Sequence, residues 1–150
     1  MMATFLTPHF SLEELSTTQQ RGLDNRPPPS VVERLRATAE QLEAVRSLLG
    51  DRPVTVTSGY RSPAVNQAVG GALRSAHMKG WAVDFNCHRF GSALDVCRAI
   101  AASSIPFDQL IEEGSWVHLS VEPRGRRQVL TKARFGYDAG LRAAATRTRT

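Results

Sequence analysis

The strongest constraint on the fold comes from two segments in which apolar and polar residues alternate, WAVDFN at residues 81–86 and WVHLSV at residues 116–121. An alternation with a period of two predicts β-strands that turn one face to a core and the other face to solvent. Asp84 and His118 occupy polar positions of these two segments. We therefore expect both side chains on the open face of one sheet.

A third segment, FDQLIEE at residues 107–113, fixes how one of these strands is paired. The Gly-Ser pair that separates it from WVHLSV suits a two-residue hairpin turn. In that register Glu113 is a diagonal neighbour of His118 on the polar face, whereas Glu112 points to the other face. A bulge or a longer loop would reverse this choice between the two glutamates.

Helices are expected before and between the strands. The expected elements are helices near residues 11–16, 30–50, 62–70 and 92–103 and a strand at residues 53–58 (PVTVTS). Ser30 and Glu33 form a capping box at the start of the long helix, and Gly50 ends it. Helices followed by strands with one interposed helix predict an α+β fold, with a small, mostly antiparallel sheet and helices packed on one face.

The 150 residues suffice for one domain with a buried core, which we place at residues 1–135. The net charge of +5 is concentrated near the end, where residues 124–150 hold eight Arg or Lys against one acid. We expect residues 136–150 to form a basic, flexible tail. No nucleic-acid partner is expected, because no aromatic residue follows Tyr137 in this basic stretch. No apolar run approaches the ~20 residues of a membrane span, so we expect no membrane span. We also expect a monomer.

His77 and Asp84 stand seven residues apart with a glycine between them. Such a short motif is weak on its own and also fits an ordinary turn that runs into a strand. Two histidines and one carboxylate, with a fourth position left for water, are a common donor set for catalytic zinc. A nearby carboxylate can then act as a general base. Because His118 and Glu113 share the face of Asp84, the metal-site hypothesis gains support.

Three blocks of the sequence closely resemble the zinc D-Ala-D-Ala carboxypeptidase family of metallopeptidases, whose relatives include phage endolysins and the hedgehog signalling domain. The blocks are SGYRSPAVNQAVGG at 58–71, SAHMKGWAVDF at 75–85 and FDQLIEEGSWVHLS at 107–120. The resemblance runs from about residue 9 to 123 and implies the hedgehog/DD-peptidase fold. It implies zinc as cofactor with His77, Asp84 and His118 as ligands, Glu113 and Arg61 as catalytic residues, and Arg61, Ser75, Trp116 and Ser120 at the substrate.

The resemblance implies a peptidase that hydrolyses peptidoglycan stem peptides with a zinc-activated water and a glutamate base. Either a D-Ala-D-Ala carboxypeptidase or an endolysin-type endopeptidase fits. The first residues, MMATFLTPHFSLEEL, lack a basic region followed by a long apolar stretch, so we expect no secretory signal. We therefore expect synthesis in the cytoplasm and action on the cell wall, with release by a phage holin as one route. The alternative is a wall-binding module that contains zinc without catalysis, against which the intact Glu113 argues.

Overall fold

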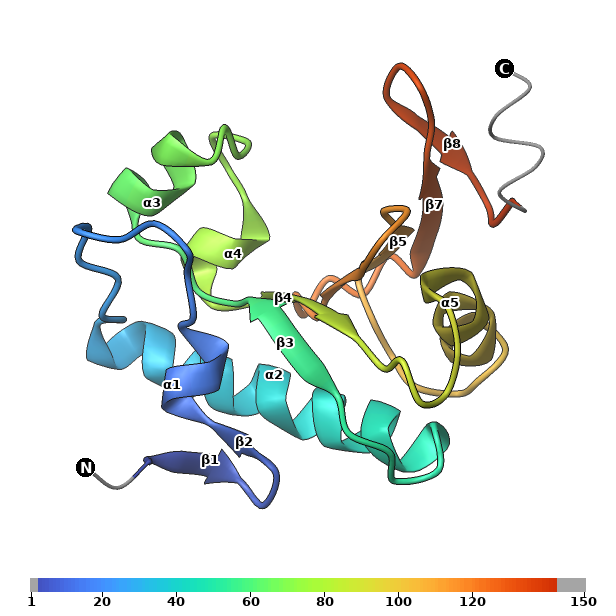
Figure 1. Ribbon diagram of the computed structural model, residues 1–150, viewed down its shortest axis with the longest axis horizontal. Coiled ribbons are helices and arrows are strands. Elements are labelled where there is room, and N and C mark those ends of the chain that lie inside the picture. The colour runs from blue at the N-terminus through green and yellow to red at the C-terminus, as the bar shows by residue number, and fades with distance from the viewer. Residues whose placement is uncertain (1–2, 143–150) are drawn as a thin grey trace.

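A computed structural model describes residues 3–142 and shows helices together with two sheets (Figure 1). The helices are α1 (Leu12–Leu15), α2 (Pro29–Leu48), α3 (Pro63–Ala68), α4 (Ala76–Lys79) and α5 (Ala93–Ala101). The strands are β1 (Phe5–Thr7), β2 (Phe10–Ser11), β3 (Thr55–Ser58), β4 (Ala82–Asn86), β5 (Gln109–Glu112), β6 (Val117–Ser120), β7 (Gln128–Lys132) and β8 (Tyr137–Ala139). The expected α+β class is confirmed.

The main sheet has six strands in the order β3-β4-β6-β5-β7-β8. Every neighbouring pair is antiparallel except β5 and β7, which run parallel. A parallel pair needs a crossover, and residues 121–127 provide it by leaving β6 and passing the start of β5. The prediction of a mostly antiparallel sheet is therefore confirmed.

The β5–β6 hairpin has the expected two-residue turn. Ile111 pairs with His118, and the backbone N–H of Glu113 donates to the carbonyl of Trp116 at 3.0 Å. Gly114 has φ +98°, a conformation that suits glycine at the first central position of such a turn. No bulge interrupts this pair. The register therefore places Glu113 on the same face as His118, as the sequence predicted.

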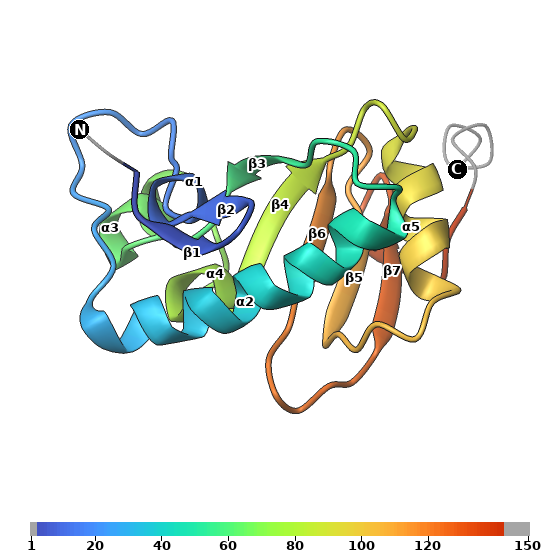
Figure 2. The same ribbon diagram turned by 90° about the horizontal axis from the view of Figure 1, so that it is seen from below.

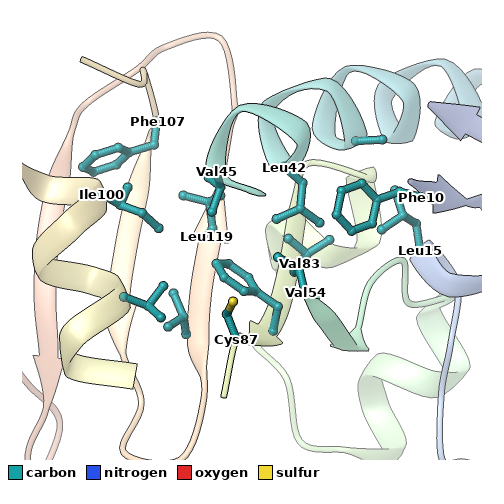
Figure 3. Close-up of a cluster of buried hydrophobic side chains, with 14 of the residues drawn as sticks. Phe10, Leu15, Leu42, Val45, Val54, Val83, Cys87, Ile100, Phe107 and Leu119 are labelled. Atoms are coloured by element: carbon teal, nitrogen blue, oxygen red, sulfur yellow. The ribbon is translucent and has the colours of Figure 1, made fainter. Parts of the chain in front are cut away.

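The apolar face of the sheet packs against α2 and α5, and the C-terminal part of α2 lies beside α5 (Figure 2). The core between these layers contains Leu42 and Val45 of α2 and Ile100 of α5 (Figure 3). Val83 and Leu119 fill it from the sheet and are fully buried. Removing such a side chain would cost roughly 2–5 kcal/mol. The opposite face of β4 and β6 is left for polar side chains.

The start of α2 differs from the prediction. The helix begins at Pro29, and its N-cap is Pro28, which makes no side-chain capping hydrogen bond. The expected capping box of Ser30 and Glu33 is therefore wrong. Proline at the first helical position has the helical φ already and lacks only an N–H that would have no helical partner there. A capping box is instead present at the start of α5, where Ser92 and Asp95 each accept the backbone N–H of the other.

Two strands near the C-terminus, β7 and β8, lie outside the sequence prediction. β8 pairs with β7 through residues 137–139, so the sheet extends past residue 135, where we placed the end of the domain. Residues 143–150 of the expected tail lie outside the described residues. Within residues 3–142, no helix has both the length and the apolar character to span a bilayer.

Candidate metal centre

Asp84 and His118 are direct partners in the antiparallel β4–β6 pair. Nδ1 of His118 lies 3.0 Å from Oδ1 of Asp84 on the face opposite the core. Their strand neighbours Val83 and Leu119 point the other way and are fully buried. Strand alternation thus brings the two side chains together, as expected.

His77 reaches the same place from α4. The Ser75 hydroxyl caps this short helix by accepting the backbone N–H of His77 at 3.2 Å. The helix ends at Gly80, whose φ of +83° is strained for other residues. A Cβ at Gly80 would lie 2.8 Å from the Val31 side chain, and the Gly80 carbonyl accepts from Thr38 Oγ1 at 2.7 Å. Close packing on α2 therefore fixes where α4 presents its histidine.

The three side chains form a compact cluster. Nε2 of His77 lies 3.2 Å from the same Oδ1 of Asp84, and the two imidazole rings are 5.1 Å apart at 60°. One ligand atom from each residue falls within 4.8 Å of the others. Two imidazole nitrogens and a carboxylate oxygen are donors that zinc accepts. His77, Asp84 and His118 could therefore hold a metal ion.

The hydrogen bonds of His77 support a cation at this place. Nδ1 lies 2.8 Å from the carbonyl oxygen of Gly59, and because a carbonyl only accepts, Nδ1 carries the hydrogen. In the neutral ring Nε2 then offers a lone pair toward the Asp84 carboxylate, and two acceptors this close require a proton or a metal ion between them. Burial lowers the pKa of His77 although Asp84 opposes this, so the proton is disfavoured. The residues fit a metal ion.

Arg61 borders the cluster from the loop after β3. Its Nη2 lies 3.5 Å from Oδ2 of Asp84, and Nε and Nη1 donate to Ser58 Oγ and Asn66 Oδ1 at 3.3 Å. Burial lowers the pKa of Arg61, against the charges of Asp84 and Glu113, but an arginine remains protonated. Burial alone would raise the pKa of Asp84, yet the hydrogen bond from His118 and the proximity of His77 hold it well below its usual range. Asp84 is therefore an ionised carboxylate beside a fixed cation.

The two glutamates of the hairpin point to opposite sides. Glu112 is fully buried and accepts the backbone N–H of Gly114, whereas Glu113 is half-buried and lines the cleft with the three candidate ligands. Burial raises the pKa of Glu113, and nearby Asp84 adds to this effect. The hydroxyl of Tyr137 lies 3.4 Å from Glu113 Oε1. Glu113 is thus the glutamate that faces the candidate metal centre.

A cleft of about 600 Å³ passes over this face of the sheet. The other residues expected at the substrate, Ser75, Trp116 and Ser120, all line it. Arg61, Asp84 and Trp116 also border an adjoining hollow of about 410 Å³, which Thr18, Gln19 and Gln20 close from the N-terminal side. The candidate metal centre therefore has open space on two sides.

Sequence reasoning missed part of the cleft wall. The missed residues include Gln109, Arg124, Arg126, Leu130, Lys132 and Tyr137. Most of these six come from the crossover and from β7 and β8. A weak signal was QVLTK at 128–132, in which the β-branched residues Val129 and Thr131 alternate with others, but this segment is too short to identify a strand without its partner.

Residues 8–120 match the sequence model of a protein family described as Peptidase M15. The zinc D-Ala-D-Ala carboxypeptidase of Streptomyces albus G is 39% identical to this chain over 77 residues, which is 51% of this chain. The matched part is 29% of the Streptomyces protein, so the chain spans less than a third of that relative's length. The match to the family model includes all three residues of the cluster, together with Glu113 and Arg61.

Proposed function

The chain belongs to the Peptidase M15 family, and on this premise we propose that it is a zinc-dependent peptidase that hydrolyses peptidoglycan stem peptides. The observation that carries the proposal is the convergence of His77, Asp84 and His118 within 4.8 Å on one wall of an open cleft. The relative from Streptomyces albus G, whose name specifies zinc and D-Ala-D-Ala, supports the choice of metal and of substrate class.

The three ligands would hold zinc, which would act as a Lewis acid on the scissile carbonyl and would lower the pKa of the attacking water. Glu113 takes the proton of the attacking water and passes it to the leaving amine. Its position on the cleft, its half-buried carboxylate and its raised pKa suit both steps. Tyr137 orients this carboxylate through its hydroxyl. Arg61, held by Ser58 and Asn66, binds the carbonyl oxygen or a carboxylate of the peptide.

Space on both sides of the candidate centre favours an endopeptidase over a carboxypeptidase. A peptide that continues in both directions can occupy the cleft of about 600 Å³ and the adjoining hollow of about 410 Å³. A carboxypeptidase would need space for only one residue beyond the scissile bond. Cleavage within the stem or the crossbridge is the mode that we expect of a wall-lysis enzyme.

The test is digestion of defined muropeptides with the zinc-loaded protein, followed by mass spectrometry of the products. An endopeptidase yields two peptide fragments, whereas a carboxypeptidase yields loss of one terminal D-Ala. Glu113→Gln should reduce the rate by roughly 10²–10⁴-fold without loss of zinc. If the protein binds cell walls but leaves every muropeptide intact, the non-catalytic binding module replaces the peptidase.

A further inference from the structure

A buried carboxylate anchors two arginines at one end of the cleft. Asp108, directly before β5, has no exposed side-chain surface. Arg126 donates to it from its backbone N–H, from Nε and from Nη2, each at 3.0 Å. Arg124 donates from Nε at 3.1 Å. Because the carboxylate is fixed inside the fold, both guanidinium groups are held in defined positions.

The two guanidinium groups are nevertheless open to the cleft. The side chain of Arg124 is 55% exposed and that of Arg126 is 41% exposed, and both line the cavity of about 600 Å³. Asp108 engages only some of the five N–H donors on each arginine. Glu122 competes weakly, with Oε1 3.7 Å from Nη2 of Arg124. Donors therefore remain for an anion in the cleft.

A third arginine lies on the wall formed by the loop before α4. Arg74 lines the same cavity, is exposed, and has no ion-pair partner among residues 3–142. Cations from two separate segments thus border the same cleft. A carboxylate is the group that such planar donors recognise best in a peptide.

The strand register places this end relative to the candidate metal centre. Ser120 follows His118 by two residues on the same face of β6, a distance of about 7 Å along the strand. Arg124 and Arg126 lie beyond Ser120, on the crossover. An extended peptide on this face advances by about 3.3 Å per residue. The arginines are thus on the order of two to three residues from a bond held at the centre.

We propose that Arg124 and Arg126, with Arg74 on the same cleft, form a subsite for a carboxylate of the substrate peptide a few residues from the scissile bond. The subsite rests on the proposed function and is separate from Arg61, which contacts Asp84 directly. Arg124 and Arg126 also lie beyond residues 8–120, the part that the family model matches. In this proposal, Arg124 and Arg126 influence which peptides the chain prefers and contribute no metal ligand.

The test uses a synthetic stem peptide and a set of variants in which each carboxylate is amidated in turn. One amidation should lower kcat/KM by roughly tenfold in the unsubstituted protein. Arg124→Gln, which leaves the Arg126 bonds to Asp108 in place, should lower kcat/KM for the acid more than for that amide, so that the acid preference shrinks. Arg98→Gln, an exposed charge change on α5, should leave both rates unchanged.

Binding supplies a readout that does not need hydrolysis. In the Glu113→Gln background, calorimetry should show the same acid preference in Kd, and this preference should be reduced when Arg124→Gln is added. Equal kcat/KM and Kd for the acid and every amide, or an acid preference that is undiminished in Arg124→Gln, would overturn the subsite. If Arg124→Gln fails to fold, the acid-to-amide ratio of the unsubstituted protein decides. No hydrolysis of any peptide contradicts the proposed peptidase instead, while calorimetry still tests the subsite.

Discussion

Oδ1 of Asp84 lies 3.0 Å from Nδ1 of His118, and the two residues face each other as direct partners across the β4–β6 pair. The same oxygen lies 3.2 Å from Nε2 of His77. One carboxylate oxygen therefore joins a strand histidine to a helix histidine, and this arrangement gives the centre its donor set.

Asp84→Ala should abolish zinc binding. The substitution removes the only carboxylate among the three candidate ligands, and with it the negative charge that two imidazoles and Arg61 face. Zinc content after dialysis, measured by mass spectrometry of the metal, should fall to background. Glu113→Ala is the matched control, because it removes a cleft carboxylate outside the cluster and should retain zinc. Stoichiometric zinc in Asp84→Ala would contradict the assignment.

Glu113→Gln should stabilise the metal-free protein at pH 7. Burial raises the pKa of Glu113 above its ordinary value, so the folded state favours the protonated side chain. The protonated side chain contributes to the free energy of unfolding at low pH, and this stabilisation is lost as the pH rises through the folded pKa. At pH 7 the ionised side chain therefore destabilises the fold. Urea unfolding should show a gain of up to about 1 kcal/mol for the glutamine, discounted for partial exposure. The gain should vanish near pH 4, and a variant that is less stable at pH 7 would refute the burial argument.

Gly80→Ala should destabilise the protein more than Gly22→Ala does. Both glycines have nearly the same backbone angle, φ +83° and +84°, but a Cβ at Gly80 meets Val31 whereas one at Gly22 meets nothing within 4 Å. The left-handed strain alone should cost about 1 kcal/mol in Gly22→Ala, and the contact with α2 should add roughly 1–3 kcal/mol in Gly80→Ala. Thermal unfolding measures both. Because Gly80 ends the helix that carries His77, zinc affinity should also fall in Gly80→Ala alone, and equal losses of stability would show that the contact has no effect.

Asp108→Asn should lower the free energy of unfolding by about 2 kcal/mol at pH 7. Burial alone would raise the pKa of Asp108, but hydrogen bonds from Arg126 and Arg124 outweigh burial and lower the pKa to about 2. Because the pKa of Asp108 is lower in the folded state, its ion pairs stabilise the fold above pH 4, and this stabilisation is lost as the pH falls toward 2. Denaturant unfolding at pH 7 and pH 2.5 measures this loss. The exposed Asp24→Asn should change stability little at either pH, and a pH-independent effect at Asp108 would contradict the ion-pair explanation.

Strand alternation was enough to predict the part of the centre that lies in the sheet. The positions of Asp84, His118 and Glu113 follow from period-two patterns and one hairpin turn, which are local properties. His77 is different, because it lies on a four-residue helix whose place depends on Gly80 packing against α2. Only the family resemblance could assign it from the sequence.

The remaining misses have non-local causes. Strand β7 forms by pairing with β5, and β8 forms by pairing with β7. These segments of five and three residues are too short for their own sequence pattern to predict a strand. No local pattern around residues 124–126 indicates that Arg124 and Arg126 neutralise Asp108, which lies sixteen and eighteen positions earlier in the chain. At the start of α2, two adjacent prolines overrode a capping-box pattern that was otherwise well formed.

The parallel β5–β7 pair has a consequence for how the cleft is encoded in the chain. It requires a crossover after β6, and this crossover carries Arg124 and Arg126 to the cleft while every candidate zinc ligand lies earlier in the chain. The candidate metal ligands and one wall of the cleft therefore lie in consecutive stretches of sequence. Exchanging residues 121–142 between relatives should change that wall as a unit and leave the three candidate ligands in place.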